Sequence, residues 1–135
     1  MKSLVEGPLK QTERVYGILY RGEFVGLIGT KETCSINKRT EIGYWLSEPF
    51  QGKGIVSRSL NFLIERAFQS WGLNRIQIKV AVGNEPSNKI PKRLGFHHEG
   101  VERQGAVMSN GKFVDLNVYS KILIAFLLPQ FALTK

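Results

Sequence analysis

The sequence predicts one domain of the mixed α/β or α+β class. Its 135 residues suit a single compact domain rather than two. Segments rich in β-forming residues alternate with segments whose apolar residues repeat every three or four positions, and both helical segments connect strands. The resulting order, ββ(β)–α–β–α–ββ, predicts a mixed sheet flanked by helices. We expect this domain to occupy residues 15–122, between a flexible polar arm (1–14) and an apolar tail (123–135).

The first part of the domain predicts three strands. Residues 15–20 and 24–30 have the composition of a hairpin, with a tight turn around Gly22. A third strand, 41–46, follows a polar loop and is rich in β-forming residues apart from Gly43.

A long amphipathic helix is predicted after the third strand. Its apolar residues recur at three- and four-residue spacing, so they share one face of a helix. These residues are Val56, Leu60, Leu63, Ile64, Ala67, Phe68 and Trp71. Gly72 stands where helices commonly end with a glycine.

The next segments predict a strand and a short helix. Residues 76–82 alternate with period two, which is typical of a strand with one buried face. Pro86 suits the first position of the following helix, and Pro91 limits that helix to a turn or two, because proline lacks a backbone donor. We expect Gly95 to end it.

The chain then predicts a hairpin and an apolar tail. Strands at 101–108 and 113–122 flank Asn110-Gly111, which is a strong turn signal. The tail favours an extended last strand followed by a packed or frayed end, and an interaction surface is the alternative.

Composition and charge narrow the classes of partner. The net charge of +8 attracts polyanions, which include nucleic acids and small ligands with several phosphates. The basic residues are scattered, which favours a solvated surface over a dedicated nucleic-acid face.

We expect no membrane span, since the longest apolar run is far shorter than the ~20 residues a spanning helix needs. The single cysteine, Cys34, and the lack of a secretory signal favour the cytoplasm. The only histidines, His97 and His98, are adjacent, so no metal site is predicted.

The segment most informative about function is the glycine-containing loop before the long helix. Gly52 and Gly54 let the main chain approach a ligand closely, and the helix start offers unpaired N–H groups and a positive dipole end. A phosphate or diphosphate is the expected ligand. The loop lacks a Walker motif and the third glycine of a dinucleotide fingerprint. On glycine spacing alone, a flexible strand-to-helix turn stays an equal alternative.

The loop resembles a known family motif. Residues 51–56, Gln-Gly-Lys-Gly-Ile-Val, are similar to the acetyl-CoA pyrophosphate loop of the GNAT superfamily of N-acetyltransferases, with Val56 in place of a small residue. The run 41–46, then Asn84-x-x-Ser87, Leu94-Gly95-Phe96 and Glu99-Gly100, resembles the branch of ribosomal-protein serine or alanine N-terminal acetyltransferases. The resemblance covers about residues 15–122.

This resemblance implies a fold, a co-substrate and a set of binding residues. The fold would be a GNAT-like mixed, mostly antiparallel sheet, splayed at the cofactor site between strands 41–46 and 76–82. Acetyl-CoA would be bound by the end of the third strand, by the loop and by the start of the next helix. The residues implied are Trp45, Leu46, Gln51, Gly52, Lys53, Gly54, Ile55, Val56, Ser57 and Asn84. An acceptor amine, a protein N-terminus being one candidate, would attack the thioester directly, with a backbone N–H stabilising the oxyanion.

Two residues are candidates for proton transfer. Glu41 is the candidate base, and a surface carboxylate at a strand edge is its structural alternative. Many superfamily members use a tyrosine as the general acid at the position where this chain has Pro91. The ribosomal branch suggests Ser87 as the substitute, and its structural alternative is a helix cap. A catalytic glutamate found in some relatives corresponds to Ala106 here.

Family members normally carry a strand and two helices ahead of the hairpin at 15–30, and only a short arm precedes it here. We therefore expect either a shortened enzyme that closes its surface as a homodimer or a fragment with reduced activity. The alternatives to an enzyme are a non-catalytic acyl-CoA-binding or regulatory module and a charge-driven RNA- or ribosome-binding protein. For an enzyme, contact with nucleic acid would be indirect, through the ribosome.

Overall fold

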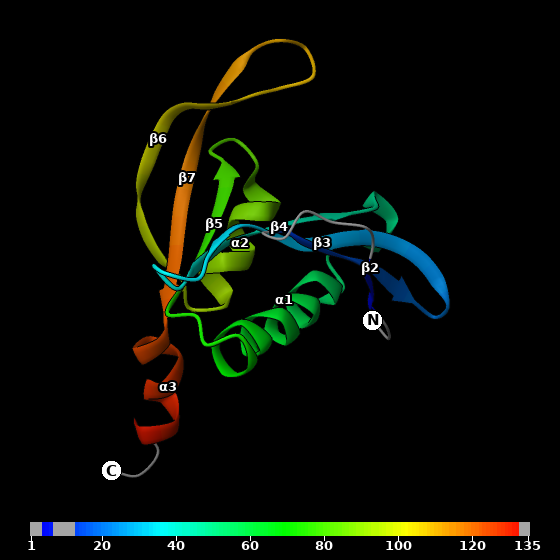
Figure 1. Ribbon diagram of the computed structural model, residues 1–135. Helices are drawn as coiled ribbons and strands as arrows, with labels where there is room; N and C mark the ends of the chain where they lie inside the picture. The colour runs from blue at the N-terminus through cyan, green and yellow to red at the C-terminus, as the bar shows by residue number, and fades with distance from the viewer. Residues whose placement is uncertain (1–3, 7–12, 133–135) are drawn as a thin grey trace. The chain divides into compact units, whose positions relative to one another are not determined.

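The computed structural model describes residues 4–6 and 13–132 of the chain. They belong to two compact units, Met1–Ile76 and Gln77–Lys135. In the first unit a run of strands precedes the helical segment, and in the second unit helices and strands are interspersed (Figure 1). The strand pairs with a defined register, in the first unit and in the second, are all antiparallel. The predicted mixed class with a mostly antiparallel sheet is therefore confirmed.

The first unit is built on antiparallel strands that follow one another along the chain. They are β1 (Leu4–Glu6), β2 (Arg14–Tyr20), β3 (Glu23–Cys34) and β4 (Arg39–Leu46). The hairpin and the third strand were predicted, although β3 continues four residues beyond the expected end at 30. Arg21 and Gly22 both have positive φ, which is the two-residue turn whose twist matches that of a hairpin.

The N-terminal segment differs from the prediction. The sequence predicted a flexible arm over 1–14, but Leu4 pairs with Ile18 and Glu6 with Tyr16 in strand β1. Three residues are too few to show an alternating pattern, so this strand could not be recognised from periodicity. Residues 1–3 and 7–12 of the predicted arm lie outside the described residues.

A helical segment covers one face of this sheet and supplies much of the buried core of the first unit (Figure 1). After a short 3-10 turn, η1 (Glu48–Phe50), it consists of α1 (Ile55–Glu65) and a π-helical turn, η2 (Arg66–Ser70). As predicted, the helix ends at Gly72, whose φ is +66°. The buried apolar side chains of this unit are Ile18, Val25, Ile28, Ile42, Leu46, Ile55, Val56, Leu60, Leu63, Ile64, Ala67, Phe68, Leu73 and Ile76.

The second unit orders its strands β5-β7-β6. Its elements are β5 (Arg75–Ala81), which begins at the end of the first unit, α2 (Glu85–Arg93), β6 (His97–Val107), β7 (Phe113–Ile122) and α3 (Leu123–Ala132). The alternation predicted for β5 is confirmed, because Ile76, Ile78 and Val80 are buried and their neighbours are less so.

Three details of the second unit correct the predictions. Helix α2 has nine residues although Pro91 lies inside it, so proline shortens the helix less than expected. In the β6–β7 turn Gly111 has positive φ and Asn110 does not, so the turn is longer than a two-residue one. The tail is helical in α3 rather than extended. None of the helices in the described part of the chain combines the length and apolarity needed to cross a membrane.

Candidate functional site

The loop between β4 and α1 exposes its main chain. Gly52 and Gly54 have φ values of +78° and +75°, a region that residues with a Cβ rarely adopt. A Cβ added to Gly52 would meet no heavy atom within 4 Å. The sequence therefore places glycine here to reach a backbone conformation, and the open space beside Gly52 leaves room for a ligand.

The start of α1 offers backbone donors to that space. Gly54 is the residue that precedes the helix, and no side chain caps it. The first N–H of the helix to reach a carbonyl is that of Arg58, which donates to Gly54 O at 3.1 Å. The N–H groups of Ile55, Val56 and Ser57 therefore precede the first intrahelical bond, at the positive end of the helix dipole. This arrangement suits a phosphate group.

The side chains at the start of α1 belong to the core rather than to the loop. Ile55 is 0% exposed and Val56 is 6% exposed. Because the Val56 side chain is buried, its larger size does not fill the space beside the glycines. Both residues can serve a ligand through the main chain alone, so the departure at Val56 leaves the loop motif intact.

The two polar side chains of the loop have different surroundings. Gln51 Nε2 donates to Leu46 O at 3.1 Å, which ties the loop back to the end of β4. Lys53 is exposed, and its Nζ lies 5.8 Å from the centroid of the Phe50 ring. Gln51 therefore shapes the loop, whereas Lys53 places a cation at its rim.

Strand β4 carries Glu41 and Trp45 on the same face, because alternate strand residues point to the same side. Glu41 is 8% exposed, so its alternative assignment as a surface carboxylate is wrong. Its Oε2 lies 3.5 Å from Lys31 Nζ, directly across the β3–β4 pair. The pair explains how a carboxylate is accommodated in the sheet, and the role of Glu41 as a base stays a prediction.

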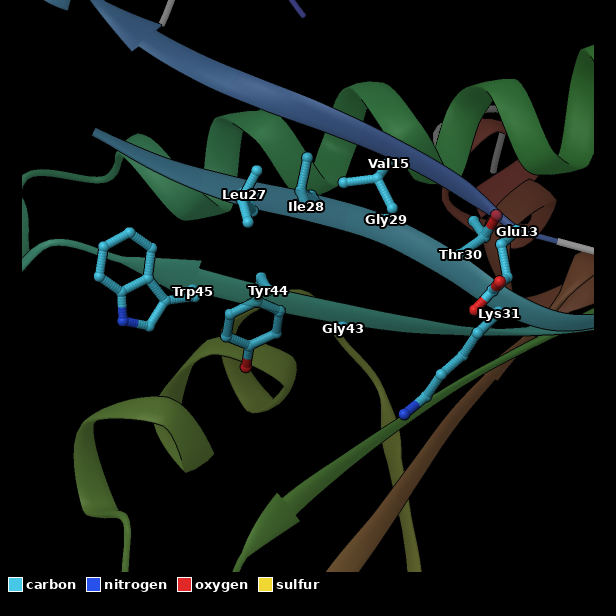
Figure 2. A pocket seen from close by; sticks show the side chains of 10 residues that line it. All are labelled: Glu13, Val15, Leu27, Ile28, Gly29, Thr30, Lys31, Gly43, Tyr44 and Trp45. Carbon is cyan, nitrogen blue, oxygen red and sulfur yellow. The ribbon is translucent and has the colours of Figure 1, made fainter. Parts of the chain in front are cut away.

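A pocket of about 330 Å³ lies over this sheet, within the first unit. It is lined by Glu13, Val15, Leu27, Ile28, Gly29, Thr30, Lys31, Gly43, Tyr44 and Trp45. Figure 2 shows Leu27 and Trp45 at one end of the pocket and Glu13 and Lys31 at the other. Gly29 faces Gly43 across the β3–β4 pair, so the middle of the pocket lacks side chains from these positions. An apolar end and a charged end suit a ligand that is itself amphipathic.

In the second unit, Asn84 and Ser87 lie at the start of α2. Asn84 precedes the helix, and its Oδ1 accepts a hydrogen bond from Ser87 N at 3.2 Å. Asn84 is therefore the capping residue, and the alternative that gave the cap to Ser87 is wrong. Asn84 is exposed and Ser87 half-buried. Their roles toward acetyl-CoA stay predictions.

Two positions at which relatives carry a catalytic tyrosine or glutamate are Pro91 and Ala106 in this chain, and neither side chain can transfer a proton. Pro91 is buried inside α2. Ala106 follows an irregularity of β6 at which Gln104 has a φ of +49° and donates its N–H to Asp115 Oδ1 at 2.8 Å. Asp115 therefore holds the irregular backbone of β6 in place. No cluster of three or more potential metal ligands occurs within residues 4–6 and 13–132.

Sequence reasoning missed two sets of residues. One is the lining of the pocket apart from Trp45, and facing glycines on neighbouring strands were its available signal. The other is the buried amide of Asn88, which is 6% exposed and bonds to Asn117 and Tyr119, 29 and 31 residues further along the chain. No local pattern signals partners that far apart.

Comparisons with known proteins point to one family. The family model described as an acetyltransferase (GNAT) domain matches residues 3–97. A putative ribosomal N-acetyltransferase of Bacillus subtilis (strain 168) is 43% identical over 104 residues, which is 77% of this chain and 56% of the relative. The ribosomal-protein-serine acetyltransferase of Escherichia coli (strain K12) is 36% identical over 126 residues, covering 90% of this chain and 70% of the relative.

Solved structures show the same similarity. A ribosomal L7/L12 alpha-N-protein acetyltransferase in complex with coenzyme A superposes with a TM-score of 0.78 at 36% identity. The match covers 84% of this chain and 64% of that one. The chain thus spans 56% to 70% of the length of these relatives.

Proposed function

The chain belongs to the acetyltransferase (GNAT) family, and from this premise we propose that it transfers an acetyl group from acetyl-CoA to a primary amine. The observation that carries the proposal is the exposed loop at Gly52 and Gly54, which leads into the uncapped N-terminus of α1. The net charge of +8 favours an anionic co-substrate.

The proposal gives each segment a part in binding. Main-chain N–H groups from Gly52 to Ser57 hold the diphosphate, with Lys53 at the rim as a neutralising cation. The end of β4 at Trp45 and Leu46 offers main-chain groups to the pantetheine arm. In the second unit, the side-chain amide of Asn84 hydrogen-bonds to the same arm. Donors fixed in the fold before the ligand arrives need little reorganisation on binding.

Acetyl-CoA supplies an acetyl group activated as a thioester. The acceptor nitrogen attacks the carbonyl carbon, the carbon–sulfur bond breaks, and the amine loses the proton that the departing thiolate gains. We assign proton removal to Glu41 or a water it orients, and proton delivery to Ser87. With the nucleophile supplied by the acceptor, the protein acts chiefly by orienting the two reactants.

For the acceptor, we propose the N-terminal amine of a protein, with ribosomal proteins as the first class to test. The support is the pair of similar relatives named for ribosomal acetylation. The pocket over β3 and β4 adds to it, because an apolar end beside Trp45 and an end with charges of both signs, Glu13 and Lys31, suit a peptide. A panel of N-terminal peptides, polyamines and aminoglycosides, assayed for acetylation by mass spectrometry, identifies the acceptor.

Replacing Gly52 by glutamate tests the loop assignment. The carboxylate would stand beside the proposed diphosphate, so we expect the affinity for coenzyme A to fall by about a hundredfold or more, as measured by calorimetry. Gly22→Glu is the matched control. Gly22 also has positive φ (+81°) and open space at its Cβ, so it introduces the same charge and similar strain in the β2–β3 turn. Equal affinities of the two variants would refute the assignment.

We also propose that the protein works in the cytoplasm and that it forms a homodimer. The single cysteine, Cys34, is free, which suits a reducing compartment. Phe24 and Phe62 are 57% and 42% exposed on the first unit and do not line the pocket, so they are apolar surface that a second copy could cover. Size-exclusion chromatography with light scattering measures the mass in solution. A monomer at working concentration would remove the dimer and leave acetyl transfer untouched.

A further inference from the structure

The side-chain amide of Asn88, in α2, has every hydrogen-bonding group occupied. Its Nδ2 donates to Ala81 O at 2.9 Å and to Asn84 O at 2.7 Å. Its Oδ1 accepts from Asn117 Nδ2 at 2.9 Å and from Tyr119 Oη at 2.7 Å. A primary amide has two donor hydrogens and two acceptor lone pairs, so this buried group is fully satisfied. Such a network has one favoured orientation, since a reversed amide would face donors with donors.

These bonds join β7 to the turn between β5 and α2. The carbonyls that Asn88 Nδ2 meets all belong to that turn. They are Ala81 O at the end of β5, the more distant Val82 O at 3.5 Å, and Asn84 O on the residue before the helix. The turn is also closed by Asn84 N, which donates to Ala81 O at 3.0 Å. Asn88 therefore fixes the main chain that carries the Asn84 side chain and, three residues on, Ser87.

The network continues to the surface through His98 on β6. Asn117 uses its Nδ2 toward Asn88, so its Oδ1 faces His98 Nε2 at 2.9 Å. An oxygen there requires His98 Nε2 to carry a hydrogen. His98 Nε2 is therefore the donor of this bond.

We propose that Asn88 is a positioning residue for acetyl transfer, which acts by holding the β5–α2 turn so that Asn84 and Ser87 meet the co-substrate. This inference rests on the proposed function. The role is indirect, since Asn88 is buried and works through the carbonyls of the turn that it binds. Its loss lets the turn relax without removing either of the residues that the turn presents.

A comparison of three variants tests the proposal. Asn88→Ala removes every side-chain bond of this amide, and Tyr119→Phe removes one of them. The matched control is Lys121→Met, because Lys121 Nζ also joins β7 to α2, by donating to Leu94 O at 2.7 Å, but at the opposite end of the helix. Each variant is assayed well below its melting temperature for kcat and KM toward acetyl-CoA, and the backbone amide resonance of Ser87 is followed by NMR.

We expect kcat/KM to fall about tenfold in Asn88→Ala and about threefold in Tyr119→Phe, with the Ser87 resonance displaced in both. Lys121→Met should keep its kcat/KM within a factor of about two of the wild type. Equal kcat/KM losses in Asn88→Ala and the control would overturn the positioning role and leave the proposed function standing. A wild type that neither binds nor turns over acetyl-CoA would remove the proposed function, and the positioning role with it. If Asn88→Ala fails to fold, Tyr119→Phe against Lys121→Met decides by the same comparison.

Discussion

A single buried hydroxyl shows how one residue links stability to pH. Tyr119 is 1% exposed, and its Oη donates to Asn88 at 2.7 Å. Burial raises the pKa of this phenol above its ordinary value of 10.0, because the anion would lose its hydration. The protonated form is also the one that can donate the bond. Folding therefore favours neutral Tyr119 at alkaline pH.

This preference predicts a loss of stability above pH 10. There the unfolded chain releases the phenolic proton while the folded chain keeps it, so the free energy of unfolding falls as pH rises. Tyr119→Phe should be about 1 kcal/mol less stable than the wild type near neutral pH, through the lost hydrogen bond, and the difference should shrink as pH rises above 10. Urea denaturation followed by circular dichroism measures both curves. A difference that stays constant across that range would contradict the expectation.

Lys121 acts in the opposite direction over a neighbouring range. Desolvation lowers the pKa of Lys121 from 10.5, so the folded chain releases this proton before the unfolded chain does. Stability from this group therefore rises with pH through the window below 10.5. Comparing the wild type with Tyr119→Phe removes this contribution, because both proteins contain Lys121.

At the scale of the element, two glycines that both have room for a Cβ atom differ in backbone conformation. Gly72 ends the helical segment at φ +66°, whereas Gly43 lies within β4 in ordinary strand geometry. A Cβ at either would meet no heavy atom within 4 Å. Packing is therefore the same for both substitutions, and the backbone decides the sign of the effect.

Alanine at these positions should change stability in opposite directions. Gly72→Ala forces a Cβ into the left-handed region and should lower the free energy of unfolding by about 1 kcal/mol. Gly43→Ala should raise it by roughly 0.5 kcal/mol, since it reduces the entropy of the unfolded chain without strain. Chemical denaturation of both variants against the wild type gives the two values. Two changes of the same sign would show that packing, rather than φ, governs these sites.

Elements with a strong period or a glycine at a forced φ could be predicted from the sequence. The α1 segment and its end at Gly72 follow from apolar spacing, and the β2–β3 hairpin follows from composition around Gly22. Strand β1 was missed because three residues hold no period. Helix α3 was missed because a uniformly apolar run without alternation fits an extended or a helical state equally well.

The candidate site divides in the same way. The loop at Gly52 and Gly54 is contiguous in sequence, so its chemistry could be predicted from residue types alone. The burial of Glu41 and the network around Asn88 depend on partners from other elements, and only the folded chain defines those partners.

At the scale of the whole molecule, the charge of +8 predicts how binding responds to salt. Coenzyme A carries several phosphate charges, and screening shortens the reach of the protein's field to about 10 Å at 0.1 M salt. We expect the dissociation constant for coenzyme A to rise several-fold between about 0.05 M and about 0.3 M sodium chloride. Pantetheine, which lacks the phosphates, is the control ligand, and its weaker binding should show little salt dependence.

The same titration distinguishes the charge-driven alternative. A protein that used its charge for RNA would show a thermal shift with RNA that disappears with salt and none with acetyl-CoA. For the enzyme proposed here, we expect the shift with acetyl-CoA. A shift with RNA alone would contradict that proposal.

The buried side chains of Ile55 and Val56 have a consequence for mapping the diphosphate loop. If the loop holds its ligand by amide hydrogens alone, truncating side chains there tells the experimenter about folding and little about recognition. The informative chemistry is replacement of a peptide bond by an ester, which deletes one donor and preserves every side chain. Such a backbone substitution at Ser57, made by semisynthesis, would weaken coenzyme A binding where Ser57→Ala would not.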